Sequence, residues 1–113
     1  MNILLIEDDA ALQMMTSRWL RRVYPHAVVT VAGSVAEALD LLGDGSFDLV
    51  VSDFDLGDAT GADVVAWMHD HRPELVARLV FFSGNSAAGE LGRPHAMKPC
   101  TMDEFRAVLA VVG

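Results

Sequence analysis

Five short, largely apolar runs alternate along the whole chain with segments that have the apolar periodicity of α-helices. These runs cover residues 3–6, 27–31, 47–53, 78–83 and 95–97. Strands that are apolar on both faces, and that alternate with helices, are typical of a parallel sheet covered on both sides. Because crossovers between parallel strands are right-handed, few topologies remain. We therefore predict an α/β fold with a doubly wound, five-stranded parallel sheet of order 2-1-3-4-5.

The segments between the runs carry the start and stop signals of helices. Ser34 with Glu37, and Thr101 with Glu104, have the spacing of capping boxes. Pro25 is expected to end the first helix. Apolar residues follow each start at spacings that place them on one face. The sequence thus predicts a helix after each of the first three strands and another after the fifth.

The interval between the fourth and fifth strands is unusually short. Only 14 residues, 84–97, separate Ser83 from Lys98, and three glycines and a proline interrupt them. Glycine in a helix interior costs about 1 kcal/mol and proline costs more. We therefore expect at most a single helical turn or a loop there, so that the fourth helix is shortened or missing.

Length, charge and cysteine content argue against several classes of protein. The 113 residues suit one domain, 1–113, and no apolar run approaches the ~20 residues of a membrane span. A formal net charge of −8 argues against direct binding to nucleic acids. Cys100 is the only cysteine, and the N-terminus lacks the order of a signal peptide. We expect a cytoplasmic protein that binds neither membranes nor nucleic acid.

Acidic side chains follow the first and third predicted strands. Glu7 and Asp8 end the first strand, Asp53 ends the third, and Asp55 follows two residues later. The carboxyl ends of parallel strands meet at one edge of the sheet, where ligands bind at the switch in strand order. Carboxylates that lie so close together repel one another, and Mg²⁺ prefers hard oxygen ligands. The sequence predicts a Mg²⁺ site at this edge.

A hydroxyl and a lysine end the other two strands at the same edge. Ser83 closes the fourth strand, and Lys98 follows the fifth. An ammonium and a hydroxyl beside a metal are the groups that stabilise a phosphoryl group. A carboxylate between them could act as the nucleophile and form an acyl phosphate. The chemistry predicted for this edge is therefore phosphoryl transfer.

Four motifs carry a family resemblance. In order they are "LLIEDD" (4–9), "DLVVSDFDLGDATG" (48–61), "VFFSGN" (80–85) and "MKP" (97–99). With these motifs the chain resembles, over its whole length, the receiver domain of two-component response regulators of the chemotaxis type, which has a flavodoxin-like fold. The resemblance implies transfer of a phosphoryl group from a phosphohistidine, followed by slow hydrolysis. The donor would be a sensor histidine kinase or a phosphotransfer protein, and the output would pass through a downstream protein target.

The resemblance also implies a role for each site residue. Asp53 would be the phosphoacceptor, with Ser83 and Lys98 on the phosphoryl oxygens. The metal would be held by Asp8 and Asp53 directly, by the backbone carbonyl of Asp55, and by Glu7 through a water. The Lys98–Pro99 peptide bond would be cis.

His95 stands where receivers commonly carry an aromatic switch residue coupled to the strand-four hydroxyl, here Ser83. A switch role and an ordinary half-buried histidine both remain open for it. Asp9 is interpreted as an N-cap or a first-turn charge of the first helix, and Asp58 as a solvated loop charge. Gly57 replaces a proline that the family often has, which should loosen the loop after Asp53.

Two other functions remain as alternatives. The same fold could serve as an interaction module that is never phosphorylated, and the short 84–94 region favours this. "DLVVSDFDLG" also resembles the nucleophile motif of haloacid-dehalogenase-type phosphatases. That motif normally lies on the first strand, and the chain has no room for a cap, so we expect a phosphoacceptor with at most slow autodephosphorylation and not an enzyme.

Overall fold

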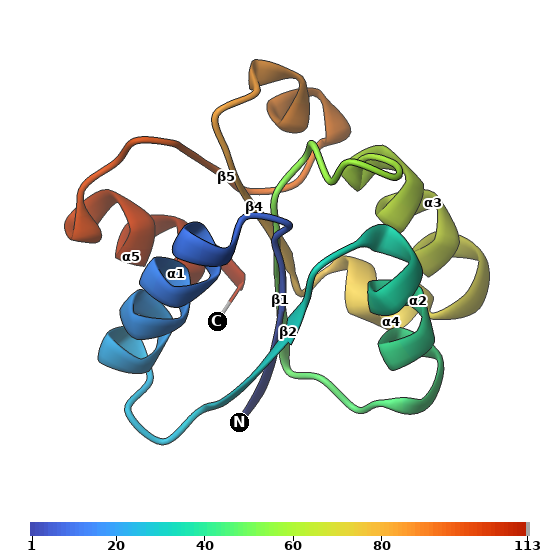
Figure 1. The fold of residues 1–113 in the computed structure, drawn as a ribbon, viewed down its shortest axis with the longest axis horizontal. Coiled ribbons are helices and arrows are strands. Elements are labelled where there is room, and N and C mark those ends of the chain that lie inside the picture. Colours follow the sequence, from blue (N-terminus) through green and yellow to red (C-terminus); the bar gives the residue numbers. More distant parts are fainter. Residues whose placement is uncertain (113) are drawn as a thin grey trace.

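The computed structural model describes residues 1–112 and contains a five-stranded, all-parallel sheet (Figure 1). Its strand order is β2-β1-β3-β4-β5. The strands are β1 (Asn2–Ile6), β2 (Val28–Ala32), β3 (Leu49–Ser52), β4 (Leu79–Ser83) and β5 (His95–Met97). The predicted fold class and strand order are confirmed; β5 has the predicted bounds, and the bounds of the other strands differ from the predicted runs by at most two residues.

Helices cover both faces of the sheet. They are α1 (Ala10–Val23), α2 (Val35–Asp44), α3 (Gly61–His71), α4 (Pro73–Val76) and α5 (Met102–Val112). Figure 1 shows α1 and α5 on one side of the sheet, with α2, α3 and α4 on the other. In residues 1–112 no helix has the length and apolar character needed to cross a bilayer.

The core lies in two layers, one on each face of the sheet. Leu4 and Ile6 of β1 pack into the cluster under α2 and α3, whereas Ile3 and Leu5 pack into the cluster under α1 and α5. All four side chains are buried. Alternate side chains of a strand point to opposite faces, so a strand covered on both faces needs apolar residues at every position. This explains the continuous apolar run before Glu7.

Helix ends follow the predicted signals. Asp9 is the N-cap of α1, and its Oδ1 accepts a hydrogen bond of 2.9 Å from the Leu12 amide. Ser34 caps α2 in the same way, accepting from the Glu37 amide at 3.1 Å. The last residue of α1 is Val23, two residues before Pro25. The N-cap role of Asp9 is confirmed.

Two short helices differ from the expectation. The predicted helices did not include α4, which begins at Pro73, a residue suited to the first helical position because its ring already fixes φ. A 3₁₀ helix, η1 (Ser86–Leu91), occupies the interval expected to hold at most one turn. At three residues per turn η1 makes about two turns, and the prediction of at most one turn was therefore wrong. Asn85 caps η1 by accepting from the Ala87 amide at 2.9 Å, and Ala88 is buried.

Gly61, the first residue of α3, gives a test of packing beneath the site. A Cβ at this position would overlap the ring of Phe81, which is fully buried. We expect Gly61→Ala to lower the free energy of unfolding by about 1–3 kcal/mol, because the Phe81 ring has no free space to move into. The measurement is urea unfolding followed by circular dichroism.

The matched control for this prediction is Gly43 of α2, where an added Cβ meets nothing within 4 Å. Gly43→Ala should leave stability unchanged or raise it by about 0.5–1 kcal/mol through helix propensity. Equal effects of the two substitutions would contradict the packing argument.

Candidate functional site

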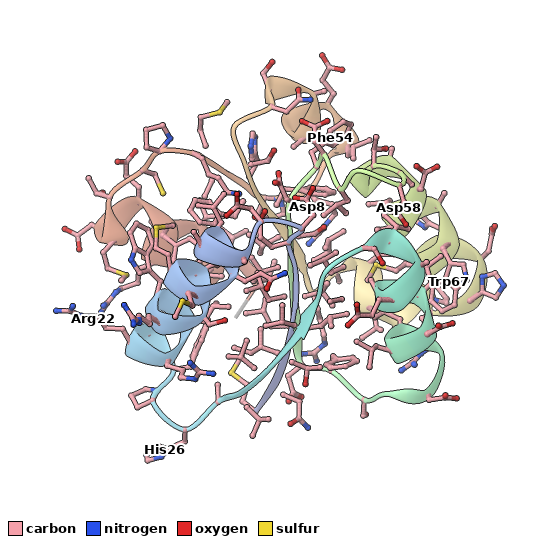
Figure 2. The ribbon with its side chains drawn as sticks, viewed as in Figure 1. Asp8, Arg22, His26, Phe54, Asp58 and Trp67 are labelled. Carbon is pink, nitrogen blue, oxygen red and sulfur yellow. The ribbon has the colours of Figure 1, made fainter. Side chains whose placement is uncertain are left out.

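The predicted site residues meet at one edge of the sheet. Glu7 follows β1, Asp53 follows β3, Ser83 ends β4 and Lys98 follows β5. All strands are parallel, so these positions lie at the same end. Figure 2 shows Asp8 and Phe54 at this end of the sheet and His26 at the opposite end.

Three carboxylates form an acidic cluster at this edge. Glu7, Asp8 and Asp53 each offer an oxygen, and these oxygens lie within 4.8 Å of one another. Glu7 is buried and Asp8 is exposed, so the cluster extends from the core to solvent. Like charges this close repel one another unless a cation shares the space. The acidic cluster predicted from the sequence is therefore present.

Lys98 places its ammonium against two members of the cluster. Its Nζ lies 2.7 Å from Oε2 of Glu7 and 3.4 Å from Oδ2 of Asp53. Burial raises the pKa of Glu7 above the ordinary glutamate value, although the hydrogen bond and the charge of Lys98 act in the opposite direction. Removing this carboxylate from water is therefore only partly offset by the lysine.

Backbone amides fix the orientation of the two inner carboxylates, and a side-chain amide binds the main chain beside them. Oδ1 of Asp53 accepts a hydrogen bond of 2.7 Å from the Phe54 amide, which leaves Oδ2 facing Lys98. Oε1 of Glu7 accepts from the Asp9 amide at 3.2 Å. The Gln13 side chain donates to the Glu7 carbonyl at 2.6 Å.

Asp53 and Lys98 open onto a cleft of about 490 Å³. Asp55, from the loop after β3, and Ser83, the last residue of β4, also line it. The Oγ of Ser83 accepts a hydrogen bond of 3.1 Å from the Asn85 amide, so its own proton stays available to donate. The cleft therefore combines a carboxylate, an ammonium and a hydroxyl donor.

Asn85 joins the two loops that form this cleft, and it was not among the predicted site residues. Its side-chain amide donates to Oδ2 of Asp55 at 3.2 Å and to Oδ1 at 3.4 Å. Asp55 follows β3 and Asn85 follows β4, so the contact bridges 30 positions of sequence. No local pattern signals such a pair.

The β5 end carries two further predicted features. The Lys98–Pro99 peptide bond is cis, as predicted. His95 is half-buried, and its Nε2 lies 3.0 Å from the backbone carbonyl of Ser83. The structure thus brings His95 to Ser83 through the main chain and not through the hydroxyl. Its role as a switch residue stays a prediction.

Asp58 requires a correction. Its side chain is exposed, as expected of a loop charge, but it is bound to the start of α2. Oδ1 accepts from the Val35 amide at 3.0 Å, and Oδ2 accepts from the Ala36 amide at 3.1 Å. These two backbone hydrogen bonds lower the pKa of Asp58 below the ordinary aspartate value of 3.8. Capping by a residue more than 20 positions away leaves no local signal in the sequence.

The lowered pKa of Asp58 predicts how a substitution there depends on pH. A carboxylate with a depressed folded-state pKa stabilises the fold above its unfolded pKa, and this contribution is lost as pH falls through the folded value. Asp58→Asn should therefore be less stable than the wild type at neutral pH, and the difference should shrink as pH falls below 3.8. The measurement is urea unfolding of both proteins from neutral pH to below pH 3.8. A difference in stability that does not change with pH would contradict the prediction.

Comparison with known proteins identifies the family. The sequence model of the family described as the response regulator receiver domain matches residues 3–109 of this chain. The alginate biosynthesis transcriptional regulatory protein AlgB is 34% identical in Pseudomonas putida and 33% identical in Pseudomonas aeruginosa. Each alignment covers 96% of this chain and 25% of the relative. The chain therefore spans about a quarter of the length of these relatives.

Solved structures agree with this match. TrrA, a response regulator from Thermotoga maritima solved with Mg²⁺ and BeF, has a TM-score of 0.84 at 16% identity. The alignment covers 99% of this chain and 98% of TrrA. At this identity the likeness shows the fold alone. A response regulator from Burkholderia pseudomallei, solved with a phosphorylated aspartic acid, a calcium ion and citrate, is 27% identical with a TM-score of 0.76. That alignment covers 96% of this chain and 65% of the other. From the sequence match, the fold and the strand-end cluster together, we conclude that this chain belongs to the receiver domain family of two-component response regulators.

Proposed function

We propose that Asp53 accepts a phosphoryl group, in a Mg²⁺-dependent reaction, from a phosphohistidine of a sensor histidine kinase or phosphotransfer protein. One observation carries the proposal: the Asp53 carboxylate belongs to the acidic cluster, lies 3.4 Å from the Lys98 ammonium, and faces a cleft that the Ser83 hydroxyl also lines. Nucleophile, cation and hydrogen-bond donor thus share one small space, as phosphoryl transfer requires.

The donor set fits Mg²⁺. The cluster offers three carboxylates whose oxygens lie within 4.8 Å of one another, and Mg²⁺ binds through one or two carboxylates with several waters retained. We assign Asp8, Asp53 and the backbone carbonyl of Asp55 as direct ligands, with Glu7 holding a bound water. The ion supplies positive charge that offsets the carboxylates and the incoming phosphoryl oxygens.

The residues of the chain then perform the transfer. An oxygen of Asp53 attacks phosphorus in line, the N–P bond of the phosphohistidine breaks, and its electron pair returns to the imidazole, which takes up a proton. The product is an acyl phosphate on Asp53. Lys98, which pairs with Glu7 and Asp53 in the structure, exchanges these partners for a phosphoryl oxygen. Ser83 donates its free hydroxyl proton to another phosphoryl oxygen.

The acyl phosphate would act as a signal and not as a step of a turnover reaction. Asp53 accepts one phosphoryl group and loses it slowly to water, so the chain is not an enzyme in the ordinary sense. The change at Ser83 would reach His95 through their 3.0 Å contact and alter the binding of a downstream protein target. We propose no direct role in binding nucleic acid.

Labelling tests the proposal directly. Incubation with radiolabelled acetyl phosphate, a small acyl phosphate, should attach label to the protein in Mg²⁺ and not in excess EDTA. The label should be released by hydroxylamine, which cleaves acyl phosphates. Absence of label in Mg²⁺, with the fold intact by circular dichroism, would overturn the proposal.

A second candidate function is favoured by one observation. The region after β4 forms only the 3₁₀ helix η1, where receivers carry a full helix as part of their signalling face. A receiver-like module that binds its partner without phosphorylation would need no such helix. The two functions separate in the labelling experiment, because the interaction module predicts no label in Mg²⁺.

A further inference from the structure

The loop between β3 and α3 forms a small hairpin beside the cleft. Asp55 and Thr60 pair as an isolated antiparallel bridge, and the Leu56 amide donates to the Ala59 carbonyl at 3.2 Å. Gly57 lies at the tip with a φ of +80°, a conformation that glycine adopts without strain. The bridge links the two ends of the hairpin. The backbone of Asp55, proposed above as a metal ligand, belongs to it.

Asp58 fastens the tip of this hairpin to another part of the fold. Its two carboxylate oxygens accept hydrogen bonds of 3.0 and 3.1 Å from the amides of Val35 and Ala36, the first two residues of α2. Figure 2 shows Asp58 between the loop and the N-terminal end of α2. The negative charge of Asp58 is thereby directed to the helix terminus, where the helix dipole favours it.

From this geometry we infer that Asp58 is a positioning residue that holds the β3–α3 hairpin in the conformation that binds the cation. The inference rests on the proposed function. Gly57 gives the tip more backbone freedom than the proline often found there in receivers, and the link to α2 restricts that freedom.

Release of the hairpin from α2 should weaken binding of the cation. If the hairpin leaves its binding conformation for part of the time, the apparent affinity for the cation falls in proportion to the fraction of molecules that still have that conformation. Asp58→Ala removes both hydrogen bonds to α2. We expect the apparent affinity for Mg²⁺ to fall about three- to tenfold, the range that loss of one helix cap produces in a local equilibrium.

The chain offers a matched control at the same helix end. The Oγ of Ser34 accepts from the Glu37 amide at 3.1 Å, so Ser34→Ala also removes a cap of α2. Among residues 1–112, the only side-chain hydrogen bonds between the start of α2 and the β3–α3 loop are the two that Asp58 accepts. Ser34→Ala should lower the unfolding temperature comparably and leave Mg²⁺ affinity unchanged.

The experiment is a Mg²⁺ titration of the full chain, followed by amide NMR, for wild type, Asp58→Ala, Asp58→Asn and Ser34→Ala. The inference expects weaker binding in Asp58→Ala, partial recovery in Asp58→Asn, which keeps one acceptor, and wild-type binding in Ser34→Ala. Wild-type affinity in Asp58→Ala, or equal weakening in Ser34→Ala, would overturn the inference and leave the proposed function standing. A wild-type protein that binds no Mg²⁺ would overturn the proposed function and the inference with it.

Discussion

Asp53→Asn is expected to abolish phosphoryl transfer while the fold remains. The amide has the same shape as the carboxylate, and its oxygen can still accept the 2.7 Å hydrogen bond from the Phe54 amide. The substitution removes the anionic oxygen that would attack phosphorus, because an amide is a poor nucleophile. It also removes one negative charge from the cluster with Glu7 and Asp8, which offsets the loss of the 3.4 Å ion pair with Lys98, so the protein should stay folded.

Labelling by radiolabelled acetyl phosphate in Mg²⁺, with circular dichroism on the same samples, measures both expectations. The matched control is Asp55→Asn, which changes the same residue type in the same cleft. Since Asp55 is proposed to act through its backbone carbonyl, this variant should still be labelled. Label that persists in Asp53→Asn, or that disappears only in Asp55→Asn, would refute the assignment of the phosphoacceptor.

Lys98→Ala is expected to have two large effects. In the metal-free protein it leaves the buried Glu7 carboxylate without its 2.7 Å partner, and among residues 1–112 no other cation pairs with Glu7 or Asp53. Removing one member of a buried ion pair costs on the order of 3–5 kcal/mol. The second effect is loss of response to beryllofluoride, a phosphoryl mimic, because no ammonium remains to meet its fluorine atoms.

Urea unfolding with and without Mg²⁺ measures the first effect, and amide NMR measures the second. Mg²⁺ should restore part of the lost stability in Lys98→Ala, because its carboxylate ligands remain. Arg106→Ala, at an exposed position of α5, is the control and should change stability by less than about 0.5 kcal/mol. A Lys98→Ala protein as stable as the wild type without metal would contradict the proposed charge balance.

The meeting of the site residues was predicted correctly from the sequence because of one property of parallel sheets. Because every strand points the same way, the residue that follows each apolar run lies at a common edge. Glu7, Asp53, Ser83 and Lys98 could therefore be placed together without knowing any distance between them. The two-sided burial of β1 gave an equally direct signal, since only a covered sheet needs four consecutive apolar residues.

The features that were missed depend on contacts between distant segments. Asp58 caps a helix that begins 23 residues earlier, and Asn85 holds a carboxylate 30 residues away. Each looks like an ordinary loop residue in the sequence, because a capping pattern is recognisable only when donor and acceptor are close along the chain. The length of η1 was underestimated for a related reason. Burial of Ala88 stabilises the 3₁₀ helix, and burial depends on packing that propensity does not describe.

The most direct test of the receiver function is an amide NMR spectrum in Mg²⁺, recorded before and after addition of beryllofluoride, with Asp53→Asn as the control. We predict shifts in the wild type alone, extending from Asp53 through Ser83 to His95 and α5. Such a pattern would mean that the site takes a phosphoryl group and passes the change along β4 and β5 despite the short η1. Shifts absent from the wild type, or equal in Asp53→Asn, would contradict phosphorylation at Asp53.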